Sequence, residues 1–515
     1  MRPQFPQPAL FMATLLAISL AGCTVGPKYV QPDLAAPANL VSANAPAAST
    51  PLSRLDETQA DLAAWWRGFK DPELDALVGR ALSDNLDRQT AASRVREADD
   101  AAVAVRANLL PSLNGTAAYD RTRISNNAGL SQISSLVGGG ASSGGVATAA
   151  LPGLEFDSYT LGLSANWNPD LFGGTRSALR AARLRQAALA WSARDTEVTI
   201  VSQVAQAYLN LRADQARLAV LEAYAGQQSD LLNLIDARSR GGLANEVDTV
   251  EQRAQLESTQ AQVAPIEADV ALRIHQLSLL LGQKPDALTG ELVAKADPIA
   301  ALPPAIPLVP MGLPSDLLRR RPDIRQAERT LAASVADVDQ ATAAPYPQVQ
   351  LTGSFDLIST ALKTLLQAAS RDYVAGASLV QPLFDGGKLR AQKHEAEEEA
   401  VQSAIAYRKA ALVAFQQTAD ALALYSADQR RLVALQAAYA DEARSANLNR
   451  AQYLGGIADL QGTLRAEAVA LKDQDQLIQT QAQLCQDLVS LYRELGGGWS
   501  GSDTIASLPP KTKNE

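Results

Sequence analysis

Residues 159–167, with the sequence YTLGLSANW, place apolar side chains at every odd position and small or polar side chains at every even one. This period of two is typical of a strand with lipid on one face and water on the other. In the second half of the chain, Leu351, Phe355 and Leu357 alternate in the same way with Gln350, Thr352, Ser354 and Asp356. The sequence therefore predicts strands at about 158–168 and 347–357, with partner strands at about 113–122 and 372–381.

Each predicted strand pair is followed by a segment that favours unusually long helices. A single proline, Pro265, occurs between Gly173 and Gly282, and none occurs between Gly387 and Leu495. The apolar content of the chain comes largely from alanine and leucine, which are strong helix formers. Long helices are predicted at about 175–240, 244–282, 388–454 and 457–495, and the first would span on the order of 100 Å.

The two halves of the chain repeat each other. Three short motifs recur at a displacement of 213 or 214 positions: Ala213-Asp214-Gln215 as Ala427-Asp428-Gln429, Gly241-Gly242 as Gly455-Gly456, and Gly173-Gly174 as Gly386-Gly387. Such a period is too long for a solenoid, so we expect two copies of one large unit. The expected parts are a first repeat at 61–282, a Pro-rich linker at 283–314, a second repeat at 315–495 and a flexible tail at 496–515.

Four strands from one chain cannot form a stable membrane structure alone. An open sheet edge would leave backbone groups without hydrogen-bond partners in hydrocarbon. The chain is therefore expected to oligomerise, and three copies would give twelve strands and a wider lumen than the eight strands of two copies. The alternative is a soluble hairpin attached to a coiled coil.

The N-terminus has the pattern of a lipoprotein signal. Arg2 precedes an apolar run over 9–22, which is shorter than a membrane-spanning helix and ends in Leu-Ala-Gly before Cys23. Residues 1–22 are thus expected to be a signal peptide, and Cys23 is expected to carry the lipid that anchors an extended segment at 23–60. Thr24 follows the cysteine where an aspartate would favour the inner membrane, so we expect the outer membrane of a Gram-negative cell.

The composition and charge argue against one class of protein and leave little room for cysteine chemistry. The chain has 515 residues, of which 47% are hydrophobic, and its net charge is −9. A negative balance argues against nucleic acid as a partner, which would require a basic face. Apart from Cys23, the single cysteine is Cys485, which we interpret as a small apolar filler on a helix.

No group of residues in the sequence suggests catalysis or a cofactor. The two histidines, His275 and His394, fall in long helical stretches without a cysteine or second histidine at ligand spacing. We therefore expect neither an enzyme nor a metal protein, and the energy for any transport must come from a partner.

Several motifs together resemble one family, the TolC-like outer membrane factors, and in particular their lipidated NodT/OprM type. The motifs are Cys23-Thr24-Val25-Gly26-Pro27-Lys28-Tyr29, Trp65-Trp66 with Phe69 and Asp71-Pro72, Arg320-Arg321-Pro322-Asp323-Ile324, and Pro382-Leu383-Phe384-Asp385-Gly386-Gly387. The resemblance implies a homotrimer, mainly α-helical, with a twelve-stranded membrane barrel and a twelve-helix periplasmic tunnel. It also implies a passive duct in a tripartite RND-type efflux system, with a periplasmic adaptor and an inner-membrane RND transporter as partners.

The resemblance further implies where such a duct is gated. Gly241, Gly242, Gly455 and Gly456 match the turns at the periplasmic tip, and Asp248 and Asp459 match acidic positions just beyond them. The family commonly has Leu-Asp-Ala-Gln-Arg where this chain has Leu-Arg-Ala-Glu-Ala, which places Arg465 at the usual aspartate and Glu467 nearby. Arg465 could pair with Asp459 or Glu467 in place of the usual partners, or these charges could simply be a solvated helix face.

The sequence leaves the exported molecule open. Drugs, metals and oligosaccharides are all compatible with a wide duct whose selectivity lies in the pump. The competing class of protein is a periplasmic coiled-coil lipoprotein without a pore.

Overall fold

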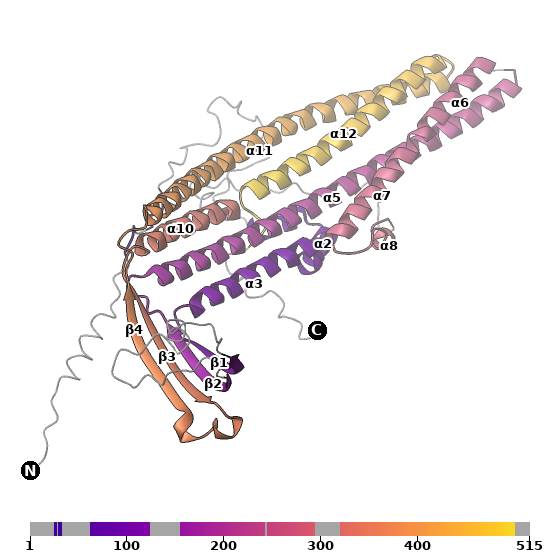
Figure 1. The fold of residues 1–515 in the computed structure, drawn as a ribbon. Helices are drawn as coiled ribbons and strands as arrows, with labels where there is room; N and C mark the ends of the chain where they lie inside the picture. The colour runs from indigo at the N-terminus through magenta and orange to yellow at the C-terminus, as the bar shows by residue number, and fades with distance from the viewer. Residues whose placement is uncertain are drawn as a thin grey trace, which may run out of the picture. The chain divides into compact units, whose positions relative to one another are not determined.

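The computed structural model describes residues 25–27, 29–32, 62–123, 155–242, 245–293 and 320–499 (Figure 1). The expected signal peptide, Cys23 and the expected tail from residue 500 onward lie outside the described residues. The chain divides into two units, each assembled from separate segments. The strand unit comprises Met1–Tyr29, Asp99–Arg183 and Ala332–Val401, and the helical unit comprises Val30–Ala98, Leu184–Leu331 and Gln402–Glu515.

The strand unit contains one antiparallel sheet with the order β1-β2-β3-β4. Its strands are β1 (Ser112–Arg123), β2 (Glu155–Trp167), β3 (Gln348–Ser359) and β4 (Arg371–Val380). The central pairing of β2 with β3 joins the two repeats, with Trp167 opposite Leu351 and Tyr159 opposite Ser359. Within the described residues, β1 and β4 are open edges.

The sheet has one apolar and one polar face. Gly115, Leu163, Phe355 and Tyr373 are aligned across the four strands by their pairing register. Leu163, Phe355 and Tyr373 in this row are exposed. Because side chains alternate between faces, the neighbouring positions carry the opposite face, where Asn114 aligns with two serines, although Val374 of β4 completes this row with an apolar side chain. This is the amphipathic pattern that the sequence predicted.

The helices are long and duplicated (Figure 1). They are η1 (Leu62–Phe69), α2 (Pro72–Asp84), α3 (Leu86–Ala107), α5 (Gly174–Arg240), α6 (Glu246–Ala261), α7 (Val263–Leu280), α8 (Thr289–Leu292), α10 (Pro322–Ala343), α11 (Lys388–Leu454) and α12 (Leu460–Glu494). Helices α5 and α11 each have 67 residues, and their bounds differ by 214 positions. The stretch from the start of α6 to the end of α7 matches α12 at the same displacement. These matches confirm the predicted fold class of a duplicated unit with a strand pair and long helices.

One expected helix is interrupted. The prediction of a single helix over 244–282 is wrong, because α6 ends at Ala261 and α7 begins at Val263, with Gln262 between them. Pro265 explains the break, since proline has no N–H to bond the carbonyl of Ala261 and its ring clashes with that carbonyl. The equivalent position in α12 is Gln479, and α12 is continuous. The expected linker at 283–314 includes the short helix α8, and its part from 294 onward lies outside the described residues.

The core of the helical unit begins with the tryptophan motif. The rings of Trp65 and Tyr492 stack at a centroid distance of 5.1 Å, which packs η1 against α12. Asp71 caps α2 through the backbone N–H groups of Glu73 and Leu74, and accepts a hydrogen bond of 2.7 Å from Tyr208 Oη on α5. Cys485 is buried in this core, and burial raises the pKa of its thiol to about 12. It is therefore a neutral packing residue.

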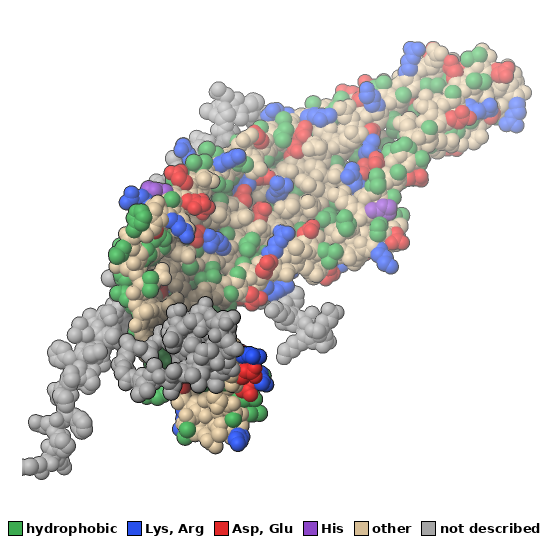
Figure 2. Space-filling view, viewed as in Figure 1, with side chains coloured by type: hydrophobic (Ala, Val, Ile, Leu, Met, Phe, Trp, Pro, Cys, Tyr) green, Lys and Arg blue, Asp and Glu red, His purple; other side chains and the backbone are tan. Residues whose placement is uncertain are grey.

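The helical surface is polar and mixed in charge. Figure 2 shows acidic and basic side chains interspersed along the helices on the visible face. In the described part of the chain, no helix combines the length and the apolar character that crossing a membrane requires.

Candidate functional site: the tip of the helical unit

The two glycine pairs form equivalent turns at one end of the helical unit. Gly242 has φ +73° and Gly456 has φ +75°, a left-handed conformation that other residues rarely adopt. Each turn is closed by similar backbone hydrogen bonds, from Gly242 N–H to Ser239 O (2.9 Å) and from Gly456 N–H to Tyr453 O (3.0 Å). The turns lie together, because Leu231, Ile235, Tyr453 and Leu460 form one apolar cluster beside them. We call this end the tip.

Asp459 is a helix cap. It precedes α12, and its Oδ1 accepts a hydrogen bond of 2.8 Å from the backbone N–H of Gly462. Asn245, displaced by 214 positions, also caps its helix, α6, and accepts from the backbone N–H of Val247, two positions on, where Asp459 accepts from the residue three positions on. The repeat thus preserves the capping role at both turns.

Two contributions of Asp459 can be measured separately, its capping of α12 and its negative charge. Asp459→Ala should destabilise α12 by about 1 kcal/mol, because one helical N–H loses its partner. Asp459→Asn should keep the cap, as Asn245 does, while removing the charge. Thermal unfolding of both variants, followed by ion selectivity in bilayers, measures the two effects. Equal stability of the two variants would contradict the capping role.

Arg465 pairs with neither of its expected partners within the chain. Its side chain is exposed and forms no ion pair with any residue that the structure describes. Asp459 is engaged at the start of α12, and Glu467 lies two positions from Arg465, on a different side of the helix. Arg465 is therefore free to interact with a group outside the described part of the chain.

Glu467 is instead the centre of a buried polar cluster. Its Oε2 accepts a hydrogen bond of 2.9 Å from Gln228 Nε2 on α5, and its Oε1 lies 3.6 Å from Arg450 Nη1 on α11. Gln252 Nε2, on α6, donates to the side-chain and backbone oxygens of Gln228. Gln228 and Gln252 are completely buried. One residue from each of four helices therefore meets here, and we call this group the tip cluster.

The charge of Glu467 is only partly compensated. Burial raises the pKa of its carboxyl group, while Arg450 and the hydrogen bond from Gln228 lower it, with burial dominant. Tyr224 is also affected, since burial and then the nearby Glu467 raise the pKa of its hydroxyl to about 12. A buried carboxylate with one long ion pair makes the tip cluster sensitive to the loss of any member.

Asp248 lies close to the opposite turn. It belongs to the first turn of α6, where a negative charge is favourable near the helix N-terminus. Burial and then the charge of Asp248 raise the pKa of Tyr453, near the end of α11. Arg238 lies over the Tyr453 ring at 6.0 Å. Asp248 therefore lies near enough to the end of α11 for its charge to act on Tyr453.

Sequence reasoning singled out Arg321 only as part of a motif, without a role. The structure places its guanidinium in a buried hub. Nη1 donates to Glu494 Oε2 (2.6 Å), and Nη2 donates to Asp323 Oδ2 (2.7 Å) and Gln417 Oε1 (2.7 Å). The hub joins the start of α10 to α11 and to the end of α12. The sequence signal was an arginine directly before the Pro-Asp start of a helix.

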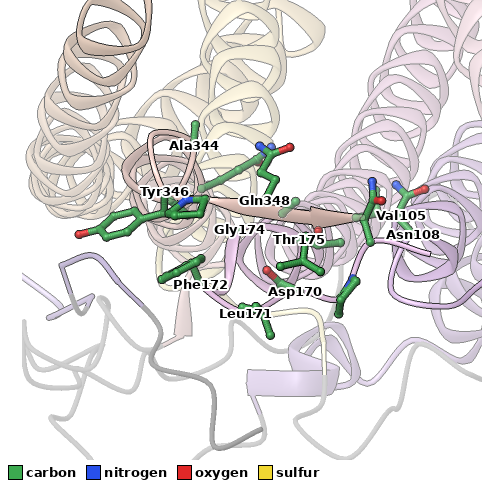
Figure 3. A pocket seen from close by; sticks show the side chains of 17 residues that line it. Val105, Asn108, Asp170, Leu171, Phe172, Gly174, Thr175, Ala344, Tyr346 and Gln348 are labelled. Carbon is green, nitrogen blue, oxygen red and sulfur yellow. The ribbon is translucent and has the colours of Figure 1, made fainter. Parts of the chain in front are cut away.

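A cavity of about 310 Å³ lies in the strand unit, at the roots of the strands (Figure 3). The Phe172 ring, which follows β2, stacks on Tyr346, which precedes β3, at 4.9 Å. Asp170 is the acidic residue of the lining, and it accepts a hydrogen bond of 2.8 Å from the backbone N–H of Arg176. The Asp170 carboxylate thus provides a hydrogen-bond acceptor for a backbone N–H in the first turn of α5.

The amphipathic sheet and the paired long helices define an outer membrane channel subunit. Residues 77–283 and 313–497 match the family of outer membrane efflux proteins, and the two matched segments correspond to the two repeats. The chain belongs to this family and acts as an outer membrane channel component of an efflux system.

Individual relatives agree with this assignment. The chain is 33% identical over 445 residues to the pyoverdine export outer membrane protein OpmQ of Pseudomonas aeruginosa, covering 85% of this chain and 88% of the relative. It is 31% identical to the toluene efflux pump outer membrane protein TtgI of Pseudomonas putida, over 94% and 97%. The solved structure of the outer-membrane channel OprN has a TM-score of 0.77 at 30% identity, over 93% and 100%.

Proposed function

We propose that three copies of the chain form a passive duct, in which their sheets close into one twelve-stranded barrel above a helical tunnel. The observation that carries this proposal is the four-stranded amphipathic sheet with open edges at β1 and β4. Open edges leave backbone groups unpaired, which is costly in lipid, and pairing β4 with β1 of the next copy removes every edge. Two copies would leave little lumen.

The repeat predicts one contact of this assembly. Phe172 stacks on Tyr346, which lies two residues before β3. Leu110 lies two residues before β1, and Phe384 follows β4 as Phe172 follows β2. Leu110 is 62% exposed and Phe384 is 94% exposed. We infer that Phe384 of one copy packs against Leu110 of the next.

A cross-linking experiment tests this contact. The double variant Leu110→Cys/Phe384→Cys, treated with a short bifunctional thiol reagent in outer membranes, should yield bands of two and three chains. The matched control is Phe172→Cys/Tyr346→Cys, whose sites lie within one chain and should leave a monomer band. If the first variant also remains monomeric, β4 does not meet β1 of a neighbour.

The duct would require partners for energy and for entry of substrate. We infer a periplasmic adaptor and an inner-membrane RND transporter, because the relatives belong to efflux pumps. The relatives named for pyoverdine, toluene and solvent export suggest small organic molecules as cargo. Deletion of the gene should increase accumulation of a fluorescent organic dye in cells, and the wild-type copy should reverse it. Unchanged accumulation would contradict this cargo class.

We also infer that Cys23 carries the lipid anchor. The support is the apolar run that ends in Leu-Ala-Gly directly before it. Mass spectrometry of the mature N-terminus should find an acylated Cys23 and no residue before it. An unmodified cysteine or an intact signal would contradict the anchor.

The tip is our proposed gate. In this account, the tip cluster holds the α5–α6 hairpin against the α11–α12 hairpin, and opening separates the two. Asp248, Asp459 and Arg465 would act between copies, around a narrow mouth.

A further inference from the structure

One buried and one partly buried carboxyl group lie next to each other in the second repeat, away from the tip cluster. Asp487 on α12 is only 6% exposed, and its Oδ1 accepts a hydrogen bond of 2.8 Å from Gln483 Nε2. Its Oδ2 has no hydrogen-bond donor among the described residues. The carboxyl group of Asp428, on α11, is close enough to act on Asp487 by hydrogen bonding and by charge. Two carboxylates in such contact repel each other.

The first repeat has an ion pair at the same two positions. Asp214 and Arg273 are displaced from Asp428 and Asp487 by 214 positions. Arg273 Nε lies 3.4 Å from Asp214 Oδ2 and joins α7 to α5. The bounds of the corresponding helices differ by the same 214 positions, so the sites are structurally equivalent. The second repeat has therefore replaced a cation with an acid while keeping the neighbouring acid in place.

The described surroundings do not supply a replacement cation to Asp487. The pKa of Asp487 is affected by its burial, by the hydrogen bond from Gln483 and by the carboxyl group of Asp428. Arg431 lies 3.9 Å from Asp428 Oδ1, but its side chain is half exposed. The Cys485 thiol next to Asp487 is neutral, because burial and then Asp487 raise its pKa to about 12. With no cation beside Asp487 in the described part of the chain, a proton can relieve the repulsion between the two carboxyl groups.

We propose that Asp428 and Asp487 bind one proton between them, and that this shared proton joins α11 to α12. When the proton leaves at higher pH, two carboxylates face each other and loosen this hairpin, while the Asp214–Arg273 pair still holds the hairpin of the first repeat. The duct would thus contain one pH-sensitive and one pH-insensitive hairpin in each copy.

The sign of the pH effect follows from the direction of the pKa change. Burial and then Asp428 raise the pKa of Asp487 to about 6, from an unfolded value of about 3.9. The stability that comes from a raised pKa is fully present below the unfolded value and is lost as pH rises through the folded one. The loss should therefore occur between about pH 4 and the folded pKa.

Thermal unfolding of the purified, detergent-solubilised protein from pH 4 to pH 8 tests the proposal. Asp487→Asn should match wild type near pH 4 and should have a higher Tm than wild type at pH 7.5. Asp487→Arg recreates the pair of the first repeat, and its Tm should exceed that of wild type at pH 7.5 but not near pH 4. A constant Tm difference between wild type and Asp487→Asn over the whole range would overturn the proposal.

Two further measurements make the test independent of folding yield. Infrared difference spectra at pH 5 should contain a protonated-carboxyl band in wild type that Asp487→Asn lacks. Arg273→Asp places a carboxyl pair in the first repeat, and it should add a second pH-dependent loss of Tm. The absence of the carboxyl band would overturn the shared proton, and an unchanged pH profile of Arg273→Asp would overturn the equivalence of the two sites.

Discussion

Arg321→Ala should lower the free energy of unfolding by about 3–5 kcal/mol, because it removes the cation from a buried ion cluster. Arg321 is 7% exposed, and without it the carboxyl groups of Glu494 and Asp323 would remain without their principal counter-charge. Asp195 would increase the cost, since burial and then Asp323 already raise the pKa of its carboxyl group. Loss of Arg321 should therefore destabilise all the interactions of this hub together.

Urea unfolding of the detergent-solubilised protein, followed by helical circular dichroism, measures this loss. Arg321→Lys should be intermediate, because an ammonium cannot reproduce the fork of donors to Glu494, Asp323 and Gln417. Arg329→Ala is the matched control on α10, the helix that Arg321 directly precedes, since Arg329 is partly exposed and its ion pair is long at 3.8 Å. If Arg321→Ala is as stable as the control, the hub does not stabilise the helical unit.

Glu467→Ala should favour the open tip. The substitution removes the acceptor of Gln228 and the ion-pair partner of Arg450, which together connect α12 to α5 and α11. Leaving buried polar groups unsatisfied costs about 1–3 kcal/mol. A change of that size shifts a two-state equilibrium by roughly 5–150-fold. We expect a higher single-channel conductance and greater sensitivity of cells to large antibiotics such as vancomycin.

Two other variants on α12 make this result specific. Lys472→Ala removes an exposed charge from the same helix and should leave conductance unchanged. Arg465→Ala tests the alternative gate between copies, where loss of the positive charge should also raise conductance. An effect of Arg465→Ala without an effect of Glu467→Ala would show that the tip cluster does not control opening.

The duplicated fold could be predicted because its determinants are local. The period of two near Leu161, the glycine pairs and the lack of proline after Gly387 are all visible in short windows of sequence. The break at Gln262 was missed although Pro265 was noted, because a proline in the middle of a long helix can kink the helix without dividing it. The continuous α12 shows what the same unit does without that proline.

The partners within the tip could not be predicted. Glu467 looked like one of several surface charges on a helix, and nothing near it in sequence indicates burial. Its partner Gln228, and Gln252 which bonds to Gln228, are more than two hundred positions away from Glu467, so their contact depends on how the hairpins pack. Neutral glutamines, moreover, do not stand out in a search for charge pairs. The capping role of Asp459 was missed for a similar reason, since a capping aspartate and a gating aspartate have the same sequence context.

The central claim is that the chain forms a trimeric outer membrane duct, and planar-bilayer recording tests it most directly. Purified protein with about three times the mass of one chain, after correction for detergent, should produce discrete conductance steps of uniform size. Adding the Glu467→Ala substitution should increase the size of those steps or the time spent open. A monodisperse monomer, or a trimer that leaves the bilayer insulating in both forms, would contradict the duct and favour a structural lipoprotein without a pore.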